Sequence, residues 1–171
     1  LNTISYQISA EKWVNTDTAK VTVVIDATLN QQGMQNLQTN MIQNLKKLVE
    51  ADWRVTDFSR NQSQSDLETV SVTAEAWIAT GQLADVRAKA LSMSKPGMKY
   101  TVSDISYQPT PDEIQQAQAQ LRSELYGKIQ SELAVVNNTY KNANFYVNNI
   151  IFMTGDMPAP MPMMKAQGAA Q

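Results

Sequence analysis

Carboxylates are the only candidate acids and bases of the usual kind in this chain, because the sequence contains no Cys and no His. Their absence excludes disulfide frameworks, zinc fingers, thiol nucleophiles and Ser–His pairs. The close carboxylate pairs are Asp66 with Glu68 and Asp112 with Glu113. We expect structural roles for both pairs. The first lies at a predicted hairpin turn, and the second lies in the first turn of a predicted helix, where the helix dipole favours negative charge.

Two further carboxylates, Asp26 and Glu75, are predicted to project from strands onto the sheet face opposite the core. Carboxylates that flank a groove could act as general acid and general base in a hydrolysis. This hypothesis requires the two side chains to lie within a few ångströms of each other in a cleft. Solvated charges on an open sheet face are far commoner. We therefore expect no enzymatic activity, no catalytic residues and no cofactor.

Methionines gather near the C-terminus, and their thioethers are soft ligands that suit Cu(I). They are Met157, Met161, Met163 and Met164. No imidazole or thiol strengthens such a site, and the interspersed prolines hinder the closing of a chelate. The favoured interpretation is that these side chains are adaptable apolar contacts for another protein. The sequence therefore predicts no metal site, with Cu(I) binding by this segment as the alternative.

Two tryptophans lie among polar residues and are candidate contact anchors. Trp77 is predicted to point away from the apolar face of its strand, and Trp13 lies in a polar segment near the N-terminus. Exposed tryptophan on a Thr- and Ser-bearing sheet is typical of a partner surface. The alternative is that the C-terminal tail or the N-terminal strand of the same chain covers it. Glycine motifs that cradle phosphates are absent from the sequence.

The charge balance and the amide content indicate the class of protein. Fourteen Lys and Arg face sixteen Asp and Glu, a formal net charge of −2 that is too balanced for a nucleic-acid or anionic-lipid partner. Seventeen Gln and thirteen Asn supply much of the polarity. Amide-rich surfaces without Cys favour an exported bacterial protein. No stretch is long and apolar enough to span a bilayer, and any secretory signal is expected to precede Leu1.

Periodicity predicts the elements that carry these residues. Period-two alternation indicates strands, and apolar residues three or four apart indicate helices. We expect a bulge in the strand at 98–107, near Ser103 and Asp104, where its alternation slips. Thr110, Pro111 and Glu113 predict a capped helix start. The expected strands cover residues 4–8, 19–29, 53–61, 67–79, 98–107 and 145–152, and the expected helices cover 34–49, 81–91 and 111–136.

This order predicts an α+β fold: an antiparallel sheet with helices packed on one face. It contains a β-α-β-β-α-β core plus an extra long helix and a closing strand. We expect residues 1–153 to form this domain. Residues 154–171 are rich in Pro, Met and Ala, have no period, and are predicted to form an extended tail.

Several of these segments together resemble the SIMPL domain family. The likeness lies in the run 17–21, in Asn40, Met41, Leu45 and Leu48 of the first helix, and in residues 53–59, 69–78, 83–91, 102–107 and 113–136. It covers roughly residues 12–152. The chain departs from the family pattern at Thr16, where members usually carry Pro, and at Asp52-Trp53, where they carry Gly and an apolar residue. In the last helix, Leu121, Leu125 and Leu133 replace small residues, which implies a different packing distance or an extra partner.

The resemblance implies a non-enzymatic periplasmic or outer-membrane-associated protein that assembles into ring-like or channel-like oligomers. We therefore expect a structural subunit of an oligomeric or multi-protein envelope complex, for example the outer-membrane core of a secretion system. Its expected partners are copies of itself or other envelope subunits. The alternative is a soluble periplasmic binding module that takes a peptide, or Cu(I) through the methionine tail.

Overall fold

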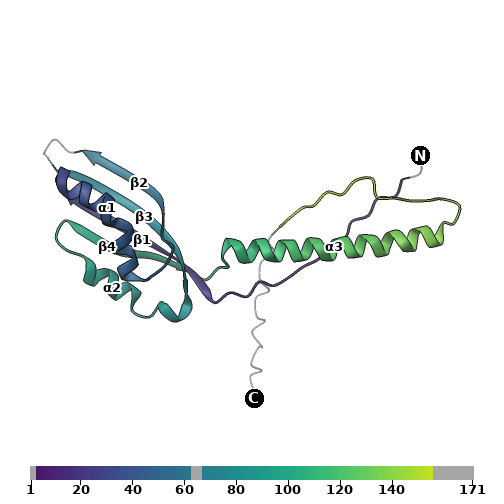
Figure 1. Ribbon diagram of the computed structural model, residues 1–171, viewed down its shortest axis with the longest axis horizontal. Helices are drawn as coiled ribbons and strands as arrows, with labels where there is room; N and C mark the ends of the chain where they lie inside the picture. Colours follow the sequence, from purple (N-terminus) through teal and green to yellow (C-terminus); the bar gives the residue numbers. More distant parts are fainter. Residues whose placement is uncertain (1–2, 63–66, 156–171) are drawn as a thin grey trace, which may run out of the picture. The chain divides into compact units, whose positions relative to one another are not determined.

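The computed structural model describes residues 3–62 and 67–155 and has an α+β fold built on a four-stranded antiparallel sheet of order β2-β3-β1-β4 (Figure 1). The elements β1, α1, β2, β3, α2 and β4 form the predicted β-α-β-β-α-β core, and the long helix α3 follows it. Their bounds are β1 Thr18–Leu29, α1 Gln31–Leu48, β2 Arg54–Gln62, β3 Glu68–Ala79, α2 Val86–Met93, β4 Met98–Ser106 and α3 Pro111–Thr139.

The centre of the core is the ladder between β1 and β3, which pair over their full lengths without a register shift. Alternate residues of β1 are buried, and Val21, Val23 and Ile25 are fully inaccessible to solvent. The opposing residues Ala76, Ala74 and Val72 are equally buried. Period-two alternation thus places most apolar side chains of both strands on one face, with Val24 and Trp77 on the other.

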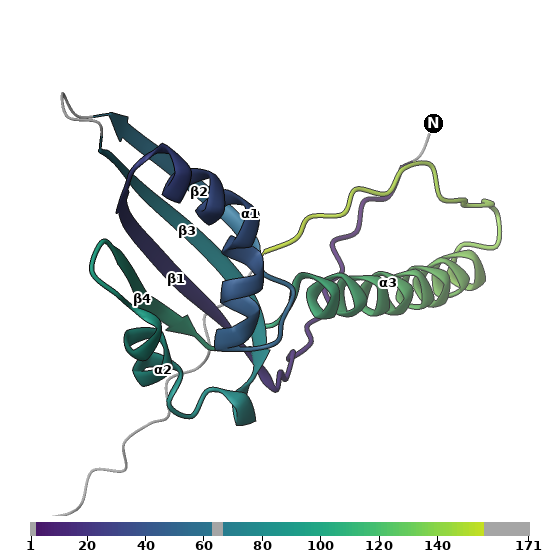
Figure 2. The same cartoon turned by 60° about the vertical axis from the view of Figure 1, so that its left-hand side comes forward.

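Helices α1 and α2 cover that apolar face in both views (Figures 1 and 2). Asn30 caps α1, because its Oδ1 accepts a hydrogen bond from the Gly33 N–H at 2.8 Å. The stripe Met34, Leu37, Leu45 and Leu48 is buried against the sheet. The helix begins at Gln31, earlier than the predicted residue 34, because the cap lies directly after β1.

The helix predicted at 81–91 is divided in two. A 3-10 turn covers Thr80–Gln82, and α2 begins only at Val86. Asp85 lies between them with φ of 60°, in the left-handed region, which interrupts a continuous right-handed helix. Of the apolar positions whose spacing predicts the buried face of this helix, Val86 and Ala90 are buried, whereas Leu91 is 61% exposed.

The bulge predicted in β4 is confirmed. Thr22 pairs with Asp104 while Val23 pairs with Val102, so Ser103 is the extra residue. The start of α3 is confirmed as well. The Thr110 Oγ1 accepts from the Glu113 N–H at 3.2 Å, and the Glu113 carboxylate accepts from the Thr110 N–H at 2.8 Å. This reciprocal pair is a capping box.

Two predicted strands are wrong. Residues 4–8 and the closing strand at residues 145–152 alternate in sequence, but the structure assigns no strand to either segment. A strand requires a neighbouring strand for its backbone hydrogen bonds, and neither segment pairs with β2 or β4, the outer strands of the sheet. Alternation therefore identified segments suited to pairing without identifying a partner.

The chain divides into two compact units, Leu1–Tyr126 and Gly127–Gln171. The first contains the sheet, α1, α2 and the first part of α3. The second contains the rest of α3 and the described residues up to 155. Nearly all of the tail predicted at 154–171, including all four of its methionines, lies outside the described residues.

Candidate interaction surfaces

The hydrolase hypothesis fails on the positions of its two carboxylates. Asp26 pairs with Ser71, whereas Glu75 pairs with Thr22. The two carboxylates are therefore four residues apart along the paired strands, which is a distance of about 13 Å at the usual rise per residue. The Asp26 carboxylate accepts a hydrogen bond from the Ser71 hydroxyl at 2.8 Å, and Glu75 lies 3.8 Å from the Lys20 ammonium. Both carboxylates make local contacts on the open sheet face.

Of the carboxylate pair at the hairpin, Glu68 is described and Asp66 is not. Glu68 is only 3% exposed, on the same face as Val70 and Val72. Its Oε1 lies 2.6 Å from the Arg60 guanidinium, and this contact raises the pKa of Arg60. Sequence analysis placed Glu68 at a turn and missed this ion pair. The available signal was the period-two pattern of β3: Glu68 lies two residues before Val70 and therefore falls on the same buried face.

Glu113 has the structural role that was predicted for it. The Thr110 N–H and the Thr16 hydroxyl both donate to its carboxylate and hold the pKa of Glu113 below its ordinary value. These bonds tie the segment that precedes β1 to the first turn of α3. In the part of the chain that the structure describes, no three carboxylates lie together in a way that could hold a metal ion.

The two candidate tryptophans differ in exposure. Trp13 is 68% exposed, in the segment before β1. Trp77 is half-buried on the open sheet face, and no acceptor among the described residues reaches its buried indole N–H. Trp53, in contrast, lies in the core and donates to the Val49 carbonyl at 2.9 Å. Trp13 is therefore the most exposed of the three tryptophans.

The N-terminal segment, residues 3–17, leaves further apolar side chains exposed. Ile4 is 44% and Tyr6 is 56% exposed. The segment is attached to the beginning of α3 at two points: Lys12 donates to the Gln120 amide, and Thr16 donates to Glu113. At the end of the segment, the Asp17 carbonyl accepts a backbone hydrogen bond from the Thr80 N–H at 2.8 Å.

The second unit contains the most exposed apolar stretch of the described chain, which we call the C-terminal segment, residues 144–155. Its beginning is fixed to α3 by Asn137, whose amide donates to the Phe145 carbonyl at 3.0 Å and accepts from the Phe145 N–H at 2.7 Å. The Phe145 ring packs edge-on against the Tyr140 ring just after the end of α3, with 6.3 Å between the ring centroids.

Beyond Phe145 the C-terminal segment turns large apolar side chains to solvent. Tyr146 is 74%, Ile151 is 76% and Met153 is 83% exposed. Concentrated exposed apolar side chains in a soluble protein mark a binding surface. The segment contains no charge and no proline from 145 to 153, and its backbone is extended without being part of a strand. It is suited to pairing with a partner sheet as well as to apolar contact.

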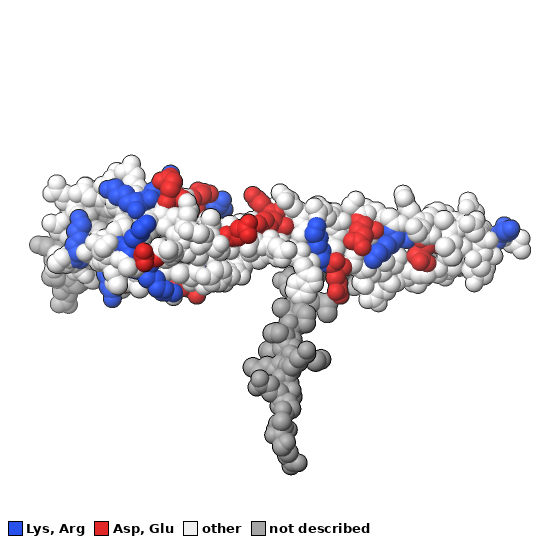
Figure 3. Space-filling model, turned by 90° about the horizontal axis from the view of Figure 1, so that it is seen from below, with Lys and Arg blue, Asp and Glu red and all other residues white. Residues whose placement is uncertain are grey.

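The open face of the sheet is a third, more polar surface. A shallow depression of about 350 Å³ lies over the end of this face, with Asp26, Ser71 and Lys99 among its lining residues. Figure 3 shows both basic and acidic side chains on the surface seen from below the molecule. No helix within the described ranges is both long and apolar enough to cross a membrane.

The chain is similar to an uncharacterized protein of Coxiella burnetii (strain RSA 493 / Nine Mile phase I). The two are 31% identical over 155 residues, which is 90% of this chain and 68% of that protein. The chain belongs to the family of this Coxiella protein. No family model matches the chain, and no solved structure matches it. The resemblance to the SIMPL domain stays a prediction.

Proposed function

We propose that this protein is a non-enzymatic structural subunit of a multi-protein complex of the bacterial cell envelope, located in the periplasm. The observation that carries the proposal is the C-terminal segment, which holds Tyr146, Ile151 and Met153 at 74%, 76% and 83% exposure. Burying a side chain of this size contributes about 1.5–3 kcal/mol. A partner that covers the segment would therefore gain several kcal/mol from these three residues.

The chemistry of the chain favours assembly over catalysis. The carboxylates considered as an acid–base pair lie far apart on the sheet, Glu113 caps α3, and Glu68 pairs with Arg60. Tyrosine is enriched among the residues that carry most of the binding energy at protein interfaces. The C-terminal segment offers Tyr146 for this role, beside the apolar residues Ile150, Ile151 and Phe152.

The periplasmic location rests on composition. The chain contains no Cys and carries thirty amide side chains, seventeen Gln and thirteen Asn. A protein without thiols avoids wrong oxidation in an oxidising compartment. The outer-membrane core of a secretion system is the kind of complex that would use such a subunit. A soluble periplasmic module that binds a peptide, or Cu(I) through Met157, Met161, Met163 and Met164, is the alternative hypothesis.

The experiment compares two exposed tyrosines in the full chain, produced in the bacterium from which it comes. Tyr146→Ser alters the C-terminal segment, and Tyr107→Ser alters a tyrosine that is equally exposed, 72% against 74%, at the end of β4. We expect the wild type and Tyr107→Ser to migrate in a large complex of the periplasmic fraction on native gels. We expect Tyr146→Ser to shift toward the free chain.

Two results would contradict the proposal. One is a wild-type chain that migrates alone in the periplasmic fraction. The other is a chain that remains in the cytoplasm of cells whose export machinery is intact. Calorimetric titration with Cu(I) tests the alternative hypothesis separately, since a structural subunit is expected to give no heat of binding.

A further inference from the structure

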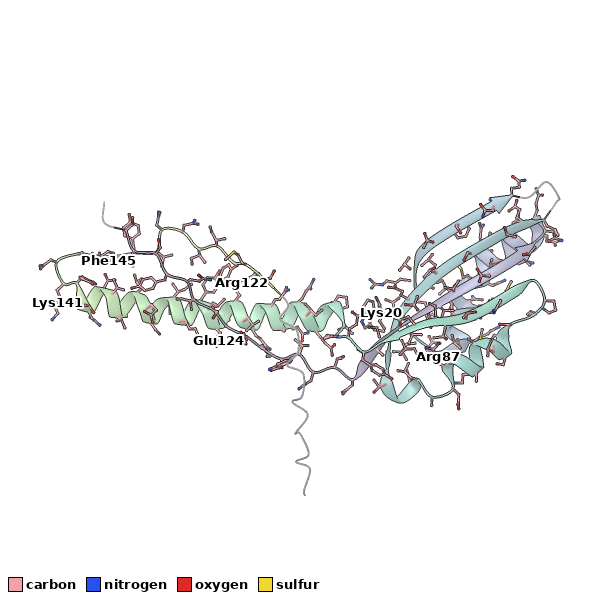
Figure 4. All side chains as sticks on the ribbon, turned by 180° about the vertical axis from the view of Figure 1, so that it is seen from behind. Lys20, Arg87, Arg122, Glu124, Lys141 and Phe145 are labelled. Atoms are coloured by element: carbon pink, nitrogen blue, oxygen red, sulfur yellow. The ribbon has the colours of Figure 1, made fainter. Side chains whose placement is uncertain are left out.

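The two edges of the sheet differ in whether another strand can join them. At β4, side chains of α2 occupy the backbone groups of the edge. The Arg87 guanidinium donates to the Val102 carbonyl at 2.6 Å, and the Ser94 hydroxyl accepts from the Tyr100 N–H at 2.9 Å. Figure 4 shows Arg87 beside β4. A strand added at this edge would have to displace both side chains.

The β2 edge is open. Among residues 3–62 and 67–155, no strand pairs with the outer side of β2, and all nine of its residues are exposed. Val55 and Phe58 are 41% and 43% exposed. They pair with the buried residues Ala74 and Val72, so they lie on the helix-covered face of the sheet. An open edge with apolar side chains is a template for pairing with another strand.

Helix α1 extends this apolar surface. Burial raises the pKa of the Tyr100 hydroxyl of β4, and the nearby Asn44 side chain partly offsets this effect, so this side of α1 faces the β4 edge. Ile42 lies two residues earlier, about 160° around the helix at 100° per residue. Ile42, which is 36% exposed, is therefore on the side of α1 that faces β2. We call Ile42, Val55 and Phe58 the β2-edge patch.

The charges of β2 also permit pairing. Arg60 lies on the same face as Phe58, and its guanidinium is neutralised by Glu68 of the neighbouring strand at 2.6 Å. Its planar face can still lie against an aromatic ring. Asp57 lies on the opposite, polar face of the sheet, opposite Thr73.

We propose that a second copy of this chain adds its own β2 antiparallel to the β2 edge, so that one sheet continues through a two-fold symmetric dimer. A two-fold axis perpendicular to the sheet keeps the helix-covered face of both copies on the same side. Residues that pair across the dimer must therefore come from the same face of the sheet. A register centred on Ser59 sets Phe58 of each copy against Arg60 of the other. Registers centred on Asp57 or Arg60 set like charges opposite and are disfavoured.

A second copy fits this edge better than the C-terminal tail does. Pro158, Pro160 and Pro162 of the tail lack the N–H that a ladder requires. A second β2 strand instead keeps its backbone N–H groups, and each copy supplies Phe58 and Arg60 as partners for Arg60 and Phe58 of the other. This inference uses residues other than those of the C-terminal segment and does not depend on the envelope role proposed above.

The absence of Cys from the chain allows a direct test with single-cysteine variants of the full protein. In the proposed register the two Ser59 residues face each other at about 4.5–5.5 Å between Cα atoms, which is within disulfide range. The matched control is Ser103→Cys, at a serine of the outer strand β4 that is also exposed. Both variants are oxidised at micromolar concentration, and dimer formation is followed on non-reducing gels.

We expect Ser59→Cys to form a disulfide dimer about 100-fold faster than Ser103→Cys, because assembly raises the effective thiol concentration to the millimolar range. Adding Phe58→Lys to Ser59→Cys should reduce this rate to that of the control. Circular dichroism of each variant checks that the fold is retained. Light scattering should show the wild type at twice its monomer mass of 19.0 kDa at high concentration.

Equal crosslinking rates for the two cysteine variants would overturn the proposal, as would a wild type that stays monomeric. If Ile151→Lys abolishes crosslinking at residue 59 while Phe58→Lys does not, the C-terminal segment is the occupant and the proposal is wrong. None of these results would change the native-gel shift expected for Tyr146→Ser, so the two proposals fail separately.

Discussion

The sheet core and helix α3 contain similar apolar patterns but bury them to different extents. In the core, Ile25 and Leu45 are fully buried between the sheet and α1. Along α3, Ala117 and Val136 are buried, whereas Ile114 is 41% exposed and Leu125 is half-buried. Periodicity tells which face of an element needs to be covered. Whether that face is fully covered depends on what lies against it, and this difference separates the stable core from the candidate binding regions.

The largest effect that tests this comparison is expected in the core. Leu45→Ala removes a side chain with no solvent exposure, and we expect it to lower the free energy of unfolding by about 2–5 kcal/mol. Leu125→Ala on α3 is the matched control and should cost less, because its side chain already contacts water. Urea denaturation followed by circular dichroism measures both. Equal losses would contradict the distinction between the two regions.

A smaller effect should appear at the attachment of the N-terminal segment to α3. Hydrogen bonds from the Thr110 N–H and the Thr16 hydroxyl lower the pKa of Glu113 from its ordinary value of 4.5. A lowered folded-state pKa contributes stability above pH 4.5, and this contribution is lost as the pH falls through the folded value. Glu113→Gln should therefore be less stable than the wild type at pH 7, and this difference should shrink as the pH falls below 4.5.

Denaturation curves of Glu113→Gln and of the wild type at pH 7 and at pH 3 provide the measurement. Asp112→Asn, in the same helical turn, is the control. A difference between Glu113→Gln and the wild type that persists unchanged at pH 3 would mean that the carboxylate charge has no part in capping α3. It would also remove one of the two attachments of the N-terminal segment.

Local chemistry made much of the fold predictable. The capping box at Thr110 and Glu113 and the bulge at Ser103 each depend on a few adjacent residues, and both were found from sequence. The same holds for the order of β1, α1, β2, β3, α2 and β4. These features follow from turn chemistry and from the side-chain period.

The features that were missed depend on residues far away in the chain. The alternation in residues 145–152 matches that of a strand, but no local pattern reveals whether an edge is available to it. Glu68 was assigned to a turn because it closely follows the polar residues 62–66 of the predicted hairpin. Its burial depends on Arg60, on the neighbouring strand. The open β2 edge could not be predicted, because strand order is a property of the whole sheet.

The most direct test of the account is amide hydrogen exchange of residues 144–153, measured in the purified chain and in the envelope complex isolated from cells. We expect fast exchange in the purified chain, because no strand of the described structure includes these residues, and protection by about 100-fold or more in the complex. The buried strand β1 serves as the internal reference and should be protected in both samples. Equally fast exchange of residues 144–153 in both samples would contradict the claim that this protein acts through its exposed apolar segment.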